Sequence, residues 1–268
     1  MEISKRLQAV ANAVTPGNRI ADVGTDHGYI PIYLVKNQIC PGGIAMDIRK
    51  GPLGIAREHI RDEKLEKKIG TRLGDGLRQV EPDEVDTVVI AGMGGSLICQ
   101  ILDERPEFFA KGKEFVLQPQ SEWFKVRRLL ARYHYEILQE WFVKEEGKYY
   151  VVLKAVPAPK ETMFQKEEKN REGRVGQTLY EQYGEYLIKE KHPLLKEYLE
   201  KEMAKKEEIV ETLQQSLPQM PDEERATSEK ERENIQKRQE RSQELIKEIK
   251  EIQTCLREQF DNDPPSGI

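Results

Sequence analysis

The chain has 268 residues, of which 34% are charged and 7% aromatic, with a formal net charge of -5. This length allows about one or two domains of roughly 100–200 residues each. No apolar run approaches the roughly 18 residues of a membrane helix, and the start MEISKRLQ lacks the apolar stretch of a signal peptide. These features do not indicate a membrane or secreted protein, and a cytoplasmic protein is expected.

The cysteines and the charge distribution exclude further classes. Cys40, Cys99 and Cys255 are far apart, so neither a disulfide framework nor a zinc site is indicated, and no metal is expected. Residues 160–268 contain 20 Lys and Arg against 26 Asp and Glu, whereas residues 1–159 are nearly neutral. A general polyanion binder is not favoured, although a local basic patch can still steer a nucleic acid.

The first predicted elements are a helix and a strand. Residues 3–14 have helical apolar spacing, with Ser4 as a candidate N-cap. In the strand predicted over residues 20–23, Ile20, Ala21 and Val23 are short and apolar, which is typical of a strand buried on both faces of a parallel sheet. The turn GTDHGY follows, and then a helix to about Asn37. The N-terminus of this helix points its free N–H groups into the turn, where nucleotide-type cofactors are held.

The spacing of acid and glycine in this turn indicates which cofactor is bound. The dinucleotide pattern Gly-x-Gly-x-x-Gly and the Walker pattern are both absent. Instead Asp22, Gly24 and Gly28 form acid-x-Gly-x-x-x-Gly, which resembles the first motif of class I S-adenosylmethionine-dependent methyltransferases. The middle position is usually Gly in that class. Here Asp26 follows Thr25 at this place, and its carboxylate is expected beside the methionine end of the cofactor.

Two further acids end the next predicted strands. Asp47 closes the strand IAMD before Ile48, about twenty residues after the glycine turn, where an acid can accept hydrogen bonds from two ribose hydroxyls. A helix over residues 50–61 follows. Asp75, before Gly76, lies where class I methyltransferases commonly contact the adenine amino group. The alternatives are a solvated acid at a strand end for Asp47 and a plain tight turn for Asp75.

The fourth strand, over residues 85–91, ends at Ala91 and is followed by Gly92, Met93 and Gly94. Methyltransferases that act on exocyclic amino groups often carry Asn or Asp, then Pro-Pro and an aromatic residue, at this place, and this chain does not. The glycines let backbone carbonyls come close to a base edge, and Met93 is expected as the only side chain able to form an apolar wall. These residues complete the predicted cofactor site.

The remaining elements predict the fold. A strand over residues 113–117 precedes a helix capped by Ser121, and residues 135–144 and 149–156 alternate as a two-strand hairpin. Five strand-helix repeats closed by an antiparallel pair predict an α/β fold, the class I, Rossmann-like methyltransferase sheet of seven strands, over residues 1–159. Residues 160–268 are predicted to form a second, helical domain.

Apolar residues in the second domain recur at helical and heptad spacing. Pro218 and Pro221 separate two stretches, which are predicted to fold back as an antiparallel coiled-coil hairpin. The apolar positions are Leu195, Leu199, Ile209, Leu213 and Met220 in the first stretch, and Ile235, Leu245, Ile249, Ile252 and Leu256 in the second. A monomer is expected, with a dimer through these helices as the alternative.

Together, ADVGTDHGYIPIYLV, the strand end at Asp47, GDGL, DTVVIAGMGG, QPQSE and the helical C-terminus resemble the bacterial tRNA adenine-22 N1-methyltransferase family over nearly the whole chain. The resemblance implies methyl transfer from S-adenosyl-L-methionine to N1 of an adenine in the D-loop region of tRNA. It also implies that the helical hairpin helps to seat the tRNA.

The chemistry of this transfer suggests roles for three residues of the turn. Neutral adenine has an in-plane lone pair on N1, and positive charge grows over N1 and N6 during transfer. Asp26 is the candidate that accepts from N6–H, stabilises this charge and positions the base. His27 is expected to hold Asp26 or contact the base, and Tyr29 to stack or hydrogen-bond. The alternatives are a helix N-cap for Asp26 and a turn residue for His27.

Arginines on expected exposed faces are the candidates for RNA contact, and together they predict a salt-sensitive affinity. They are Arg6, Arg49, Arg57, Arg127, Arg128 and Arg132. Two other functions remain open at this stage. One is a methyltransferase of a small molecule or protein, whose hairpin is a dimerisation device. The other is a non-catalytic cofactor-binding scaffold with a coiled-coil interaction arm. A nicotinamide enzyme is a distant third.

Overall fold

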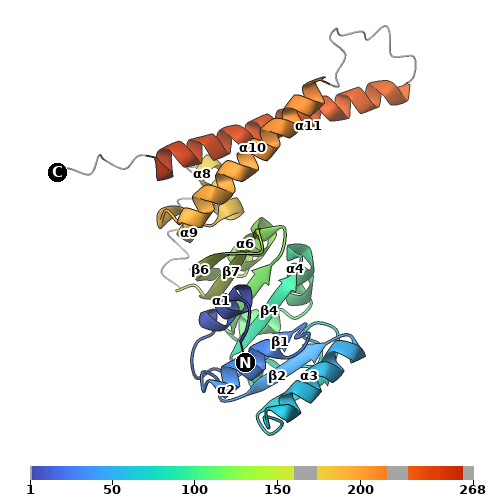
Figure 1. The fold of residues 1–268 in the computed structure, drawn as a ribbon, viewed down its shortest axis with the longest axis vertical. Helices are drawn as coiled ribbons and strands as arrows, with labels where there is room; N and C mark the ends of the chain where they lie inside the picture. Colours follow the sequence, from blue (N-terminus) through green and yellow to red (C-terminus); the bar gives the residue numbers. More distant parts are fainter. Residues whose placement is uncertain (1, 160–173, 216–228, 262–268) are drawn as a thin grey trace, which may run out of the picture. The chain divides into compact units, whose positions relative to one another are not determined.

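The computed structural model describes residues 2–159, 174–215 and 229–261. The chain splits into two compact units, Met1–Leu187 and Ile188–Ile268, and each is described by itself (Figure 1). The strands, all in the first unit, are β1 Ile20–Val23, β2 Gly43–Asp47, β3 Ile69–Leu73, β4 Thr87–Met93, β5 Glu114–Pro119, β6 Tyr135–Glu145 and β7 Lys148–Pro157. The helices are α1 Lys5–Ala13, α2 Tyr29–Lys36, α3 Lys50–Asp62, η1 Pro82–Glu84, α4 Gly95–Asp103, α5 Glu107–Ala110, α6 Trp123–Arg132, α8 Arg174–Tyr183, α9 Glu185–Lys189, α10 Pro193–Gln215, α11 Glu229–Cys255 and the short π-helical turn η2 Leu256–Phe260.

The seven strands form one sheet in the order β3-β2-β1-β4-β5-β7-β6. The first five are parallel, and the hairpin β6–β7 joins β5 in antiparallel orientation. This confirms the seven-stranded sheet predicted from the sequence. The order reverses direction between β1 and β4, so their carboxyl ends flank the crevice where doubly wound sheets bind ligands.

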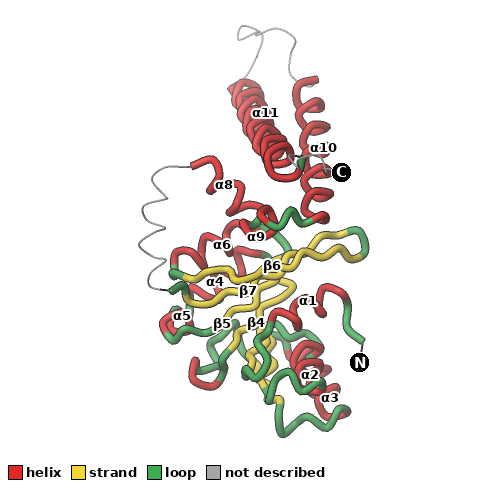
Figure 2. Tube along the Cα trace, turned by 90° about the vertical axis from the view of Figure 1, so that its left-hand side faces the viewer, coloured by secondary structure: helices red, strands yellow, loops and turns green. Residues whose placement is uncertain are grey.

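Helices cover both faces of the sheet. Figure 2 shows α1, α2 and α3 on one face and α4, α5 and α6 on the other. β1, β2 and β5 are buried along their whole length, as the apolar runs in the sequence predict for strands covered on both sides. None of the helices among the described residues is long and apolar enough to cross a membrane.

The two serine caps expected from the sequence have different outcomes. Ser4 caps α1, because its hydroxyl accepts a hydrogen bond from the backbone N–H of Leu7 at 3.3 Å. The prediction that Ser121 caps the next helix is wrong. The N-cap of α6 is Glu122, whose φ of 53° is left-handed and whose side chain makes no cap hydrogen bond. That side chain instead accepts from the hydroxyl of Ser96 on α4.

The end of β4 differs from the sequence prediction. The strand continues through Gly92 to Met93, and its pairing with β5 shifts between Ala91 and Met93. Gly92 has a φ of +81°, which favours glycine at this irregularity. The irregularity turns the N–H of Gly92 to the side-chain oxygen of Gln118 on β5 at 3.0 Å. The strand end is therefore anchored to a buried side chain.

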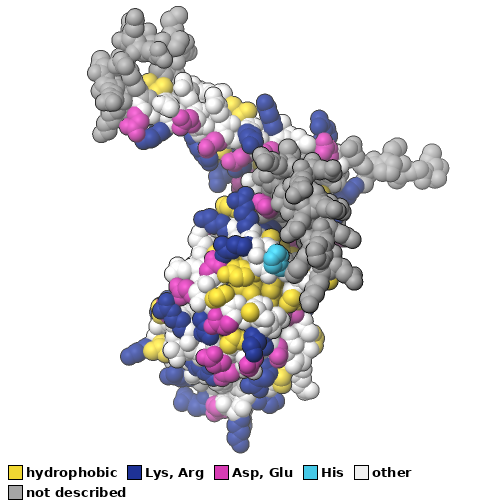
Figure 3. Space-filling model, turned by 180° about the vertical axis from the view of Figure 1, so that it is seen from behind, with side chains coloured by type: hydrophobic (Ala, Val, Ile, Leu, Met, Phe, Trp, Pro, Cys, Tyr) yellow, Lys and Arg dark blue, Asp and Glu magenta, His cyan; other side chains and the backbone are white. Residues whose placement is uncertain are grey.

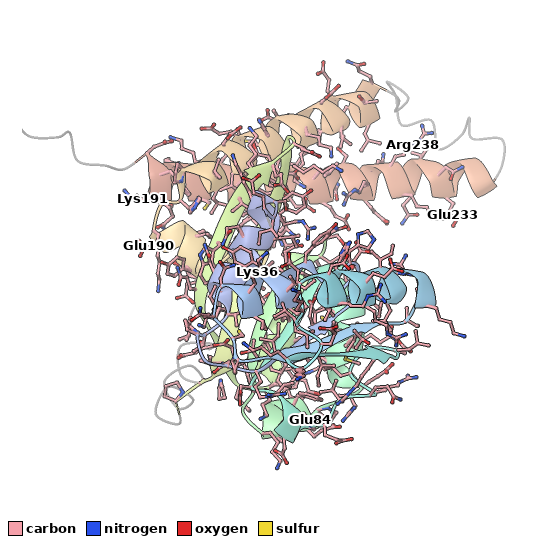
Figure 4. All side chains as sticks on the ribbon, turned by 60° about the horizontal axis from the view of Figure 1, so that its bottom comes forward. Lys36, Glu84, Glu190, Lys191, Glu233 and Arg238 are labelled. Carbon is pink, nitrogen blue, oxygen red and sulfur yellow. The ribbon has the colours of Figure 1, made fainter. Side chains whose placement is uncertain are left out.

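In the second unit, α10 and α11 pair in antiparallel orientation. Lys196 contacts Asp261, and further along α10 Lys206 contacts Glu248, both at 2.7 Å. Charged side chains such as Glu233 and Arg238 project from α11 (Figure 4). The helical C-terminal region is thus confirmed, and a coiled-coil geometry stays a prediction.

The apolar stripe of this pair is largely the predicted one. Leu195, Leu199, Leu245, Ile249, Ile252 and Leu256 are buried. Ile209 is exposed, so its predicted place on the stripe is wrong, and Val210 packs with Leu245 and Ile249 instead. Met220 lies outside the described residues.

Candidate functional site

A cavity of about 750 Å³ lies in the first unit, at the carboxyl ends of the central parallel strands. Its volume falls within the range of about 300–1,000 Å³ that is typical of ligand pockets. The lining residues are Arg6, Leu7, Asp22, Val23, Gly24, Thr25, Asp26, Tyr29, Ile30, Asp47, Ile48, Arg49, Gly74, Asp75, Gly76, Ala91, Gly92, Met93, Leu97, Ile101 and Gln120. The structure thus brings most of the predicted cofactor residues and two of the predicted catalytic ones, Asp26 and Tyr29, to one cavity.

Two predicted cofactor residues and one predicted catalytic residue are not part of the lining. Gly28 is buried, with a φ of +75°, and a Cβ there would lie 3.3 Å from the Cβ of Ala56 on α3. Gly94 is the N-cap of α4. His27 lies beside the cavity without lining it. Gly28 and Gly94 therefore shape the backbone around the cavity.

The loop after β1 is held by its own backbone. The N–H of Thr25 donates to the carbonyl of Met46 on β2 at 2.7 Å, and the N–H of Gly28 donates to the carbonyl of Thr25 at 3.0 Å. Gly24 has a φ of +72°, which favours glycine, and a Cβ there would require the terminal methyl group of Met93 to move. The backbone bond from Thr25 fixes the loop against β2.

Asp26 lies at the exposed part of this loop. Its φ is 53°, a left-handed backbone that Asp tolerates better than most residues, and its side chain is 61% exposed. The alternative interpretation of Asp26 as a helix N-cap is wrong, because the N-cap of α2 is Gly28 and no side-chain cap bond forms. The loop thus presents the carboxylate of Asp26 to the cavity without using it to start the helix.

Asp22 is the most perturbed acid of the cavity. It is 4% exposed, and the hydroxyl of Thr25 donates to its Oδ2 at 2.5 Å. Burial raises the pKa of Asp22, the Thr25 hydrogen bond lowers it, and the nearby Asp47 and Asp26 carboxylates raise it, with a net value of about 7. A positively charged ligand group near Asp22 would favour its ionised form.

The other two predicted acids of the cavity differ in their surroundings. Asp47 is 4% exposed, and its Oδ1 accepts from the backbone N–H of Arg49 at 2.8 Å. Asp75 is exposed and lies 3.4 Å from the guanidinium of Arg78. Both carboxylates lie in the cavity wall, so the structure is consistent with the proposed contacts to hydroxyl and amino groups.

Apolar side chains form a larger part of the wall than the sequence suggested. Met93 is the one side chain that the glycine-rich loop contributes, and Leu97 and Ile101 of α4, Leu7 of α1 and Ile48 after β2 line the cavity with it. Ile48 is 62% exposed and Leu97 is 47% exposed. Large exposed apolar side chains at a cavity are suited to cover the faces of a flat ring.

Three rings cluster beside Asp26. His27 and Tyr29 are 5.6 Å apart between ring centroids, and His59 of α3 lies 5.7 Å from Tyr29. Nδ1 of His59 donates to the backbone carbonyl of His27 at 2.9 Å, while Nε2 of His27 lies 3.6 Å from Oδ1 of Asp26. The sequence signal for His59 was absent, because an isolated histidine on a helix carries no motif. In the folded chain it supports the loop that carries Asp26.

The six predicted RNA-binding arginines are dispersed. Arg6 and Arg49 line the cavity, whereas Arg57 hydrogen-bonds Thr71 at the surface. Arg128 and Arg132 of α6 are exposed and paired with Glu181 and Asp103.

The prediction that Arg127 is exposed is wrong. Its side chain is buried, contacts Glu140 at 2.7 Å and donates to the carbonyls of Glu181 and Gln182. These partners satisfy the guanidinium in the interior, so it is not available to RNA.

The described residues contain no group of three or more His, Cys, Asp or Glu side chains that could hold a metal ion. The cavity is therefore interpreted through its carboxylates, backbone groups and apolar wall. Four carboxylates against two guanidinium groups favour a ligand that carries positive charge and hydroxyl groups. S-adenosyl-L-methionine, with a sulfonium, an ammonium and a ribose, has this chemistry.

Comparison with known proteins supports this interpretation. A family model described as a methyltransferase domain matches residues 3–153, which is more than half of the chain. The fold and the cavity are those of a methyltransferase domain. The chain is also 35% identical over 164 residues to the tRNA (adenine(22)-N(1))-methyltransferase of Bacillus subtilis (strain 168), covering 61% of this chain and 69% of that protein. The chain belongs to this family.

Solved structures extend the similarity to nearly the whole chain. The crystal structure of the B. subtilis M1A22 tRNA methyltransferase TrmK has a TM-score of 0.74 and 30% identity, covering 92% of this chain and 98% of that one. A Streptococcus pneumoniae structure in complex with S-adenosyl-L-methionine has a TM-score of 0.73 and 29% identity, covering 95% and 100%. The family and the cofactor class predicted from the sequence are confirmed.

Proposed function

We propose that this protein transfers a methyl group from S-adenosyl-L-methionine to N1 of the adenine at position 22 of tRNA, in the cytoplasm. The activity is that of the relatives named above. The single observation that carries the site assignment is the position of Asp26. It is a carboxylate on a left-handed turn, at the carboxyl end of β1 and in the wall of the cavity.

Different residues of the cavity contact different parts of the cofactor. Asp47 accepts from the ribose hydroxyls, since its Oδ1 is already oriented by the N–H of Arg49. Asp75 faces the adenine amino group, and Ile48 and Leu97 cover the ring. Asp22 lies beneath the methionine end, where the positive charges of the donor stabilise its ionised form. The other predicted residues in the cavity wall, Gly24, Thr25, Gly76, Ala91, Gly92 and Met93, shape the wall at the strand ends.

S-adenosyl-L-methionine supplies an electrophilic methyl carbon: the N1 lone pair forms the new bond while the S–C bond breaks, and that electron pair remains on sulfur. The methylated adenine then carries the positive charge over N1 and N6. Asp26 accepts a hydrogen bond from N6–H, so its negative charge stabilises the transition state and fixes the ring orientation. No strong base is required, because N1 of neutral adenine is already unprotonated.

His27 and Tyr29 complete the acceptor side. His27 lies next to the Asp26 carboxylate and orients it, and Tyr29, which lines the cavity, stacks on the target base or hydrogen-bonds to it. Because the Watson–Crick edge of a base in folded tRNA is often paired, the target adenine is extruded before it enters the cavity.

Contacts to the tRNA backbone come from exposed basic side chains. Arg49, Arg57, Arg128 and Arg132 remain candidates, together with the C-terminal helices. Figure 3 shows basic and acidic side chains intermixed over one face of the first unit, without a large region of one sign. The number of phosphate contacts is measured by the slope of log affinity against log salt.

A monomer is the proposed state. The apolar stripes of α10 and α11 are buried against each other within one chain, at Val210, Leu245 and Ile249. A second copy is therefore not needed to cover them.

The proposed function is tested with methyl transfer from labelled cofactor to unmodified tRNA, comparing the wild type with Asp26→Asn. Asn also tolerates a left-handed backbone, so the loop is preserved. Loss of one electrostatic stabiliser should lower the single-turnover rate by about 10²–10³-fold. Cofactor affinity, measured by calorimetry, should stay within about threefold of the wild-type value.

The matched control is Asp62→Asn, which removes an exposed carboxylate at the end of α3, outside the cavity lining. It should transfer at the wild-type rate. Mass spectrometry of the product nucleoside should identify 1-methyladenosine. A wild type that binds the cofactor but does not methylate tRNA would refute the proposed substrate, and an Asp26→Asn variant that retains full rate would refute the role of this residue.

A further inference from the structure

Arg6 differs from the other predicted RNA-binding arginines because it is half-buried and lies in the cavity wall. It belongs to α1, which packs against β5 and the hairpin strands β6 and β7. The guanidinium lies 5.7 Å from the ring centroid of Tyr150 on β7. The side chain is thereby held over the strand ends.

The partner that fixes Arg6 is a buried amide. Nη1 of Arg6 donates to the side-chain oxygen of Gln118 at 2.8 Å, and the same oxygen accepts from the N–H of Gly92 at 3.0 Å. The amide nitrogen of Gln118 donates to the carbonyl of Pro119 at 3.2 Å, which orients the amide. Gln118 has no exposed surface. A buried side chain therefore aims the guanidinium into the cavity.

The charge of Arg6 is not neutralised by this partner, because an amide carries no net charge. In the part of the chain that the structure describes, no carboxylate oxygen lies within 4.0 Å of the Arg6 guanidinium. By contrast, Arg72, Arg105 and Arg127 each face one. A preoriented guanidinium with unused donors is suited to a bidentate contact with an anion.

We propose that Arg6 binds an anionic oxygen group of a ligand in this cavity. The group is either the carboxylate of the methyl donor or a phosphate of the target nucleotide. The four aspartates of the wall would repel an anionic group, so such a group needs a cationic partner, and among the lining residues only Arg6 and Arg49 can supply one. Arg49 already lies 3.5 Å from Asp47. This inference rests on the proposed function.

Calorimetry with Arg6→Gln and Arg6→Lys distinguishes the two sources of the anion. The probes are S-adenosyl-L-methionine and 5′-methylthioadenosine, which has the same adenosine and sulfur but no amino-acid part. If Arg6 binds the carboxylate, Arg6→Gln should weaken S-adenosyl-L-methionine about 10- to 100-fold and leave 5′-methylthioadenosine unchanged. Arg6→Lys, which keeps the charge without the planar fork, should lose less.

If Arg6 binds a phosphate, both small ligands should keep their affinity. Arg6→Gln should then weaken tRNA binding and lower the slope of log affinity against log salt by about one. Arg61→Gln is the matched control, since Arg61 is exposed on α3 and outside the cavity lining. Retained binding of 5′-methylthioadenosine also reports that Arg6→Gln is folded.

The inference is overturned if Arg6→Gln binds the cofactor and tRNA like Arg61→Gln, or if it loses 5′-methylthioadenosine together with both. Failure of the proposed function has a different signature, because the wild-type protein itself would then bind no S-adenosyl-L-methionine or would not methylate tRNA.

Discussion

Two ion pairs with the same 2.7 Å separation show how differently the two units use charge. In the first unit, Arg127 and Glu140 are paired with 5% and 1% of their side chains exposed. In the second, Lys206 and Glu248 are paired with 17% and 32% exposed. Distance alone does not set the value of such a pair. Burial and the surrounding hydrogen bonds decide it, because a buried charge that loses its partner cannot return to water.

The surroundings of the first pair are specific. Arg127 also donates to the carbonyls of Glu181 and Gln182, and Glu140 accepts from the N–H of Leu187 at 3.4 Å. Gly184 has a φ of +94°, and a Cβ there would overlap the Glu140 carboxylate. The pair thus ties the end of α8 and Leu187 of α9 to α6 and β6. The pair on α10 and α11 adds only a surface contact to an apolar stripe.

The largest expected effect is on the buried pair. Arg127→Met leaves the Glu140 carboxylate without its charged partner and should lower the free energy of unfolding of the first unit by about 3–5 kcal/mol. Both tryptophans, Trp123 and Trp141, lie in this unit, so urea unfolding followed by tryptophan fluorescence reports it selectively. The double variant Arg127→Met with Glu140→Met should be closer to the wild type.

The matched control is Lys206→Met. Its partner Glu248 is about one-third exposed and can be solvated, so the loss should stay below about 1 kcal/mol in unfolding followed by helical circular dichroism. Equal losses for Arg127→Met and Lys206→Met would contradict the contrast between the two pairs.

The next largest effect separates cofactor binding, which is assigned to the first unit, from tRNA binding, to which α10 and α11 are proposed to contribute. A chain that ends after Lys189, the last residue of α9, keeps every cavity-lining residue and should bind S-adenosyl-L-methionine within about twofold of the full-length affinity. Because α10 and α11 are proposed to seat the substrate, tRNA affinity in a filter-binding assay should fall about 10- to 100-fold. Unchanged tRNA affinity would remove that role from the helices.

The smallest expected effect is the pH dependence that the buried carboxyl group of Asp22 gives to stability and cofactor binding. Asp22 ionises at about pH 7 in the folded protein and near its ordinary value of 3.8 when unfolded. Between these values the folded state keeps a proton that the unfolded state has lost. The contribution of Asp22 to the free energy of unfolding therefore falls as the pH rises from about 4 to about 7, and is constant above.

Cofactor binding has the opposite pH dependence, because the cationic donor binds the ionised form. Affinity should rise about tenfold between about pH 6 and about pH 8, as the ionised fraction of Asp22 increases. Asp22→Asn should bind weakly and without this rise in the same calorimetric series. A wild-type profile that matches the flat profile of Asp22→Asn would show that Asp22 does not titrate in this range.

The parts of the site that depend on local chemistry were predictable from the sequence. Asp22, Gly24 and Asp47 lie at strand ends where turn chemistry is visible in a few residues, and parallel strands bring those ends together. Arg6 could not be assigned in this way, because its partner Gln118 is 112 residues away in the sequence. Arg127 was misjudged for the same reason, since the carbonyls that bury it come from a segment more than 50 residues further along.

The left-handed backbone at Asp26 affects how substitutions of this residue would be scored in a variant screen. A non-glycine residue at φ 53° costs about 1–2 kcal/mol relative to glycine, which is the residue usual at this place in class I methyltransferases. Glycine here would relax the turn while removing the carboxylate. A screen that ranks variants by thermal stability or cellular abundance would therefore rate Asp26→Gly as neutral or beneficial, and only a readout of modified tRNA would detect the damage.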